Sequence, residues 1–134
     1  MKDSDLAFII SILKGEKSEC CNIDWYAVVG FLELHKIVGM FYRKAKALDY
    51  KLPHKVDNIL SRTLSNQKRR VEFFRRETEK ISQYLISKKT EHIFLKGSVL
   101  SALDETKQVY SDGERISNDI DILVKLPKDR SVLR

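Results

Sequence analysis

The sequence predicts an α/β protein in the wide, α+β sense: a helical region over residues 1–90, followed by a small strand-containing region over residues 91–134. Two observations predict this. Up to residue 90, apolar residues recur at three- and four-residue steps, the period of an amphipathic helix. After residue 90, two short apolar runs, one beginning at His92 and one at Asp119, have the length and composition of strands.

The first two helices have clear boundary signals. The apolar spacing from Asp5 to Lys14 predicts a short helix, which Gly15 ends, and the polar stretch from Glu16 to Cys21 predicts a loop. Asn22 or Asp24 can cap the next helix. The residues of that helix with helical spacing are Trp25, Val28, Val29, Leu32 and His35.

A glycine and a proline divide the rest of the helical region. We expect Gly39 to interrupt the helical pattern, with a further helical piece from Met40 to Leu48. Pro53 suits the first turn of a long helix that runs to about Lys89. Its apolar stripe, with two polar gaps at Gln67 and Thr78, consists of Leu60, Leu64, Val71, Phe74, Ile81 and Leu85. Such a stripe predicts packing on other helices, with a self-associating coiled coil as the alternative.

The same long helix is basic. Its cations are Lys68, Arg69, Arg70, Arg75, Arg76 and Lys80, and the aromatic residues Phe73 and Tyr84 lie among them. Interleaved glutamates at 72, 77 and 79 can pair with these cations at helical spacing, which favours a solvated face. The alternative is a groove for a polyanion, such as an RNA acceptor.

Two acids stand at the start of the second predicted strand. In a strand, Asp119 and Asp121 point to the same face, and the opposite, buried face takes Ile120, Ile122 and Val124. Paired carboxylates on a rigid element suit Mg²⁺, which proteins hold with one or two carboxylates plus substrate phosphates. Solvated turn residues are the alternative interpretation.

The first predicted strand ends in a turn that can hold an anion. After the apolar run from His92, Gly97 allows a tight turn, and Ser98 can cap a new helix whose first N–H groups bind anions. Lys96 either reaches a phosphate or faces solvent. Together with the two acids, this turn is sufficient to place a nucleoside triphosphate and its metal.

The stretches FLKGSVL and SDGERISNDIDILVKLPKD resemble the signature of the DNA polymerase beta-like nucleotidyltransferase superfamily. Within it, they are most similar to the N-terminal portion of the bacterial family of uncharacterised nucleotidyltransferases. The positions that match the family pattern are Leu95, Lys96, Gly97, Gly113, Arg115, Asn118, Asp119, Asp121, Leu123 and Val124.

The resemblance implies a nucleotidyltransferase-type small mixed sheet, cut short at its second strand. Because a two-stranded sheet is marginally stable in isolation, we expect the helices or a second copy of the chain to cover it. It implies transfer of a nucleoside monophosphate from a nucleoside triphosphate to a hydroxyl acceptor. Asp119 and Asp121 would be the catalytic and metal-binding residues, with Mg²⁺ or Mn²⁺. The implied nucleotide-binding residues are Lys96, Gly97, Ser98 and Arg115, although a loop salt bridge is the alternative for Arg115.

The sequence departs from the superfamily pattern in one respect. A third carboxylate normally comes from a later strand, but between Asp121 and Arg134 the only acid is Asp129, which fits a solvated or capping position in a turn. We therefore expect a half-site. The chain is then a fragment of a longer protein, a site that a partner or a second copy completes, or a module that has lost catalysis.

Composition excludes several classes of protein. With 43% hydrophobic and 33% charged residues, the chain is globular rather than disordered, and no apolar stretch predicts a membrane span. Cys20 and Cys21 are adjacent, which argues against a disulfide framework or a zinc site and suits the cytoplasm. The spacing of His35, His54 and His92 predicts no metal site. The net charge of +6 is compatible with a nucleotide or nucleic-acid partner.

Three hypotheses remain. The chain is a metal-dependent nucleotidyltransferase or a catalytic portion of one, which we favour. Alternatively, it is an inactive nucleotide-binding remnant or regulatory module, or a helical nucleic-acid-binding or interaction protein.

Overall fold

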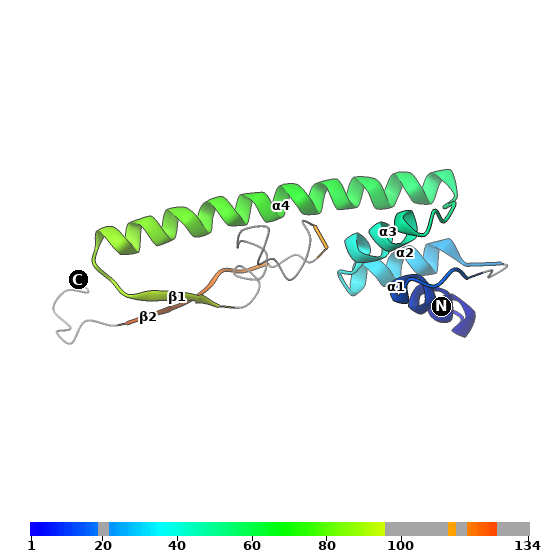
Figure 1. The fold of residues 1–134 in the computed structure, drawn as a ribbon, viewed down its shortest axis with the longest axis horizontal. Coiled ribbons are helices and arrows are strands. Elements are labelled where there is room, and N and C mark those ends of the chain that lie inside the picture. Colours follow the sequence, from blue (N-terminus) through cyan, green and yellow to red (C-terminus); the bar gives the residue numbers. More distant parts are fainter. Residues whose placement is uncertain (19–21, 96–112, 115–117, 126–134) are drawn as a thin grey trace.

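The computed structural model describes residues 1–18, 22–95, 113–114 and 118–125. Within them, the helices are α1 (Asp3–Lys14), α2 (Trp25–Leu34), α3 (Val38–Ala47) and α4 (His54–Ser87), and the strands are β1 (His92–Leu95) and β2 (Asp121–Val124) (Figure 1). The predicted α+β class is confirmed. No helix among the described residues has the length and apolarity needed to span a membrane.

The ends of the first helices follow local chemistry. Gly15 ends α1 in the left-handed conformation, with φ at 84°. The carboxylate of Asp24 accepts hydrogen bonds from the backbone N–H groups of Tyr26 and Ala27, each at 3.1 Å, and so caps α2. Both signals were visible in the sequence, and of the two proposed caps it is Asp24 that is used.

The break between α2 and α3 is not where the sequence predicted it. Gly39 lies inside α3, and the chain turns instead at Lys36, which has a positive φ of 56°. The prediction was wrong because a glycine in a helical pattern can serve close packing rather than a turn. Pro53 is the residue that precedes α4 rather than part of its first turn.

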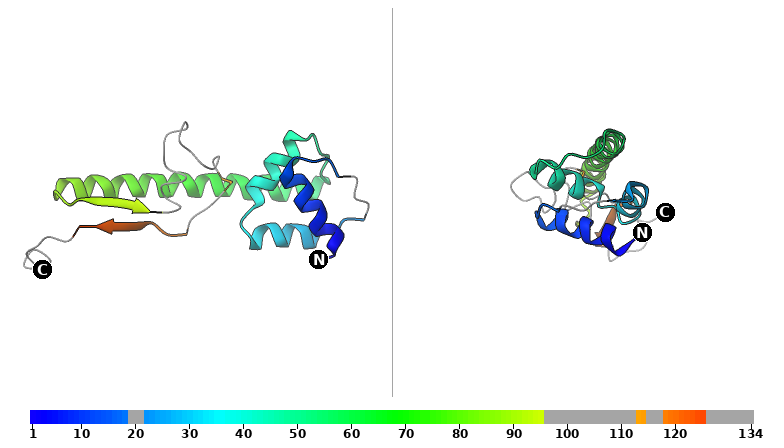
Figure 2. Two further views of the ribbon diagram at one scale, coloured as in Figure 1. Left: turned by 60° about the horizontal axis from the view of Figure 1, so that its bottom comes forward. Right: turned by 90° about the vertical axis from the view of Figure 1, so that its right-hand side faces the viewer.

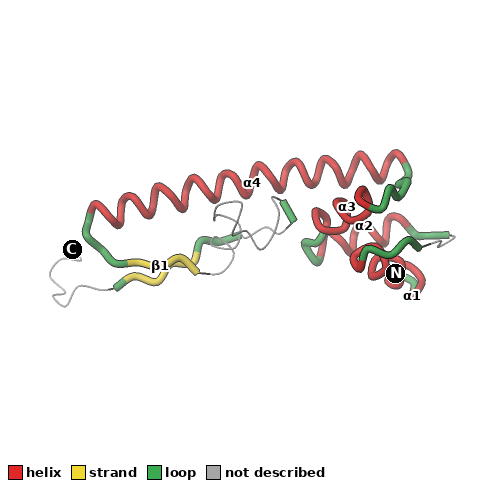
Figure 3. Tube along the Cα trace, in the orientation of Figure 1, coloured by secondary structure: helices red, strands yellow, loops and turns green. Residues whose placement is uncertain are grey.

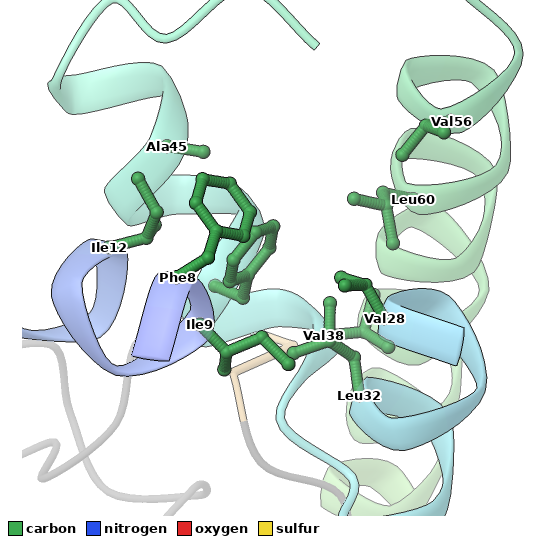
Figure 4. Packing of buried hydrophobic residues seen from close by; sticks show 10 residues of the cluster. Phe8, Ile9, Ile12, Val28, Leu32, Val38, Ala45, Val56 and Leu60 are labelled. Carbon is green, nitrogen blue, oxygen red and sulfur yellow. The ribbon is translucent and has the colours of Figure 1, made fainter. Parts of the chain in front are cut away.

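The core joins α1, α2 and α3 to the first turns of α4. Phe8 lies at its centre and contacts the rings of Trp25, Phe41 and Tyr50 at centroid distances of 5.5, 6.0 and 5.3 Å. The buried hydrophobic cluster consists of Phe8, Ile9, Ile12, Val28, Leu32, Val38, Phe41, Ala45, Val56 and Leu60 (Figure 4). The first sixty residues therefore form a helical bundle with a core of its own.

A buried carboxylate joins two of these helices. Asp5, which is fully buried, accepts hydrogen bonds from the backbone N–H groups of Lys2 at 2.9 Å and Asp24 at 3.1 Å. These two bonds hold the pKa of Asp5 below its usual value, because they stabilise the charged carboxylate. Asp5 thereby connects the N-terminus of α1 to the start of α2.

Helix α4 extends far beyond the bundle. It has 34 residues and so a length of about 50 Å. Its first part packs on the bundle, and the remainder runs beside the two strands (Figures 1 and 2). The buried residues of α4 are Val56, Leu60, Leu64, Gln67, Val71 and Thr78. The first half of the predicted stripe and its two polar gaps are thus buried, whereas Phe74, Ile81 and Leu85 are half-buried.

The two described strands form an antiparallel pair beside the far part of α4 (Figure 3). His92 pairs with Val124, and Leu95 pairs with Asp121. One face of the pair meets α4, where the His92 ring nitrogen Nε2 lies 3.0 Å from the Ser82 hydroxyl. The other face carries Ile93 and is exposed among the described residues.

Candidate metal and nucleotide site

The two acids stand at the start of β2. Asp121 is the first residue of the strand and is half-buried, whereas Asp119 is exposed and precedes the strand. The predicted strand thus begins two residues later than the run suggested. Ile122 is half-buried, but Val124 is 39% exposed, contrary to the prediction of a buried face. Val124 is exposed because it pairs with the first residue of β1, at the end of the sheet.

The strand register places the end of β1 beside these acids. Leu95, the last residue of β1, lies opposite Asp121. In the sequence, the predicted phosphate-binding turn begins directly after Leu95. The residues assigned to that turn and to the loop, together with the acid nearest the C-terminus, lie outside the described residues: Lys96, Gly97, Ser98, Arg115 and Asp129.

A turn that precedes β2 is seated against the helices. A Cβ atom placed on Gly39 would lie 2.1 Å from the carbonyl oxygen of Gly113, so only a glycine allows this approach between α3 and the turn. A Cβ on Gly113 would itself lie 2.8 Å from Leu64 of α4, and Gly113 has a positive φ of 81°. Both glycines therefore serve one contact, in which the turn lies between α3 and α4.

Two arginines contact the chain on either side of residues 115–117. The Nε of Arg43 on α3 lies 3.8 Å from a carboxylate oxygen of Glu114. The Nη2 of Arg70 on α4 donates a hydrogen bond to the side-chain oxygen of Asn118 at 3.1 Å. Asn118 directly precedes Asp119. Helices α3 and α4 thus contact the segment that carries the acids, a role for Gly39, Arg43 and Arg70 that no motif in the sequence indicated.

The donor set at β2 fits a hard divalent cation. Two aspartates, separated by one residue, supply oxygen ligands, which is the donor chemistry that Mg²⁺ prefers. Among the residues that the structure describes, no group of three His, Cys, Asp or Glu side chains is arranged to hold a metal ion. A pair of carboxylates is sufficient where substrate phosphates supply further ligands.

The basic residues of α4 point in different directions. Arg70 lies over the Phe74 ring at 5.7 Å and contacts Asn118, so it belongs to the side that faces the strand segment. Another side of the helix forms an open hollow of about 470 Å³. The residues that line this hollow are Lys68, Arg69, Glu72, Phe73 and Arg76.

The comparisons with known proteins gave one match. A sequence profile of the family described as uncharacterised nucleotidyltransferase matches residues 22–134. Searches of the curated proteins and of the solved structures found no match. The profile spans the helices from α2 onward as well as both strands and the two acids. With most of the chain matched, the protein belongs to the family of uncharacterised nucleotidyltransferases, which supports a general nucleotidyltransferase role.

Proposed function

We propose that the protein transfers a nucleoside monophosphate from a nucleoside triphosphate to a hydroxyl group. In this reaction the acceptor oxygen bonds to the α-phosphorus, the bond from that phosphorus to the β-phosphate oxygen breaks, and pyrophosphate leaves. The hydroxyl proton passes to solvent. Membership of a nucleotidyltransferase family supports the reaction class. The metal, the triphosphate and the acceptor are the parts that this proposal adds.

The observation that carries the proposal is the pairing of Leu95 with Asp121. Residues directly opposite each other in an antiparallel pair lie about 4.5–5.5 Å apart at Cα. The chain therefore leaves β1 toward the Lys96-Gly97-Ser98 sequence from a point beside the acids. A triphosphate held by that sequence would have its phosphates within reach of both carboxylates.

Asp119 and Asp121 would hold Mg²⁺ or Mn²⁺. A bound divalent cation supplies charge neutralisation and a template for the attacking and leaving oxygens. The residues assigned to the triphosphate, Lys96 and Arg115, would add positive charge, and the backbone N–H groups that follow Gly97 would donate hydrogen bonds. Phosphoryl transfer depends on positioning and charge stabilisation more than on covalent chemistry, so few residues are needed.

The test is calorimetric titration of the four nucleoside triphosphates into the protein, first with Mg²⁺ and then with EDTA. We expect magnesium-dependent binding that the double variant Asp119→Asn, Asp121→Asn abolishes. A matched control removes two acids from the bundle, Asp3→Asn and Asp49→Asn, with the same change in net charge, and should bind as the unaltered protein does.

Two outcomes would contradict the assignment of these acids. One is an unchanged affinity in the Asp119 and Asp121 double variant, and the other is an equal loss in the control. Pyrophosphate release, measured with hydroxyl acceptors present, then tests transfer itself. Binding without release would instead support the inactive nucleotide-binding module.

A further inference from the structure

The positive charge of α4 is concentrated in its central part. Residues 68–76 contain five cations and one acid, Glu72. Residues 54–67 contain two cations and one acid, and residues 77–87 contain one cation and two acids. A helix that is merely solvated needs no such concentration, since alternating charges serve solubility equally well.

Part of this charge surrounds an exposed aromatic ring. Phe73 is 59% exposed in a helix whose other face is buried, and it lines the 470 Å³ hollow together with Lys68, Arg69 and Arg76. We call these four residues the basic strip. Glu72 accepts a hydrogen bond from Arg76 Nε at 2.9 Å, which fixes the position of that guanidinium but leaves the strip with an excess of cations.

The basic strip is adjacent to the candidate metal site along the helix. Arg70, whose guanidinium contacts Asn118 at 3.1 Å, directly follows Arg69 of the strip. Asn118 in turn directly precedes Asp119. By the helical rise, the strip spans about 12 Å from Lys68 to Arg76. The strip is therefore level with the acids along the helix axis but lies on another side of α4, so a bound strand reaches the acids by passing around the helix.

We propose that the hydroxyl acceptor is single-stranded RNA, bound along the basic strip. This inference rests on the proposed function. Cations complement the phosphates of the RNA backbone, and an exposed aromatic ring stacks on unpaired bases. RNA presents such bases in its loops and ends, which proteins recognise by stacking on aromatic side chains and arginine planes. A terminal hydroxyl of the bound strand would be the group that receives the nucleotide.

The test measures fluorescence anisotropy of a labelled single-stranded RNA of mixed sequence at low salt. We expect a Kd of about 100 μM or tighter, with a strong salt dependence. The triple variant Arg69→Gln, Phe73→Ala, Arg76→Gln should weaken binding at least tenfold, and Phe73→Ala alone by about fivefold to a hundredfold. The matched control, Lys55→Gln with Arg62→Gln, removes the same amount of charge from the same helix outside the strip and should change the Kd less than threefold.

The same assay is repeated with each alternative partner. Equal affinity for single-stranded DNA of the same sequence, for duplex RNA, or for poly-glutamate would overturn the assignment of single-stranded RNA, as would an equal loss in the control variant. Failure of this inference is distinct from failure of the proposed function. If the protein binds a nucleoside triphosphate with magnesium but binds no RNA, the basic strip is not an RNA site, and the proposed function stands.

Discussion

The helical bundle and the strand pair differ in how they are stabilised. In the bundle, Phe8, Phe41 and Leu60 are fully buried. In the strand pair, Ile93 is 61% exposed and Leu123 59% exposed. A two-stranded antiparallel pair is at best marginally stable by itself. A helical bundle with a continuous apolar core is stabilised by the apolar surface that it buries.

This difference indicates that the helices determine where the two acids lie. Since the strand pair has little core of its own, its position depends on contacts with the helices: the Gly39–Gly113 approach, the Arg43–Glu114 ion pair and the hydrogen bond from Arg70 to Asn118. The helices thus support the candidate site rather than merely precede it. Variants in each region can separate stability of the bundle from placement of the acids.

The largest effect should come from the bundle core. Phe8→Ala leaves a cavity among three aromatic rings and should lower the free energy of unfolding by about 3–5 kcal/mol. Phe73→Ala, which truncates a phenylalanine that is 59% exposed, should change it by about 0.5 kcal/mol or less. Urea unfolding followed by circular dichroism measures both. Equal losses would show that the core does not carry the stability of the bundle.

Two helical glycines offer a matched pair. Gly30→Ala in α2 meets open space and should gain about 1 kcal/mol from helix propensity. Gly39→Ala meets the Gly113 backbone, so we expect a net loss of about 1–3 kcal/mol together with weaker binding of magnesium and nucleotide. Thermal unfolding and calorimetric titration provide the two measurements. If both substitutions stabilise the protein, the backbone of Gly113 does not pack against Gly39.

The Asp5 carboxylate gives the bundle a pH dependence. Because its pKa is lowered in the folded state, its contribution to stability is present above the pKa of the unfolded chain, about 3.9, and is lost as the pH falls through the folded-state pKa. Asp5→Asn should therefore lower the melting temperature at pH 7, and the difference from the unaltered protein should shrink below about pH 4. A difference that stays constant down to pH 2 would contradict this explanation of the pH dependence.

The smallest effect should come from a single arginine beside the acids. Arg70→Gln removes the charged donor to Asn118, and because the pair is exposed, the affinity for magnesium and nucleotide should fall by no more than about fivefold. Arg69→Gln, whose side chain bonds Asn66 instead, is the control with the same charge change. Calorimetric titration at one ionic strength compares them. An equal loss in both variants would assign the effect to net charge rather than to placement of the strand.

The sequence was sufficient to predict the features that depend on residues close together in the chain. The glycine that ends α1, one of the two candidate caps of α2, and the buried first half of the α4 stripe all follow from short-range patterns and are confirmed. The motif around Asp119 and Asp121 was also sufficient for the family, which the profile match confirms.

The tertiary structure alone decided the features that depend on distant segments. Nothing near Gly39 in the sequence indicates that Gly113 packs against it, so a local rule for glycine predicted a break where close packing was the cause. The same holds for Val124, whose exposure depends on where β1 begins, and for Arg70, whose partner lies 48 residues away. Spacing in a sequence determines which residues share a face of one element. Which faces meet depends on how the whole chain packs, and that is where the position of the two acids is decided.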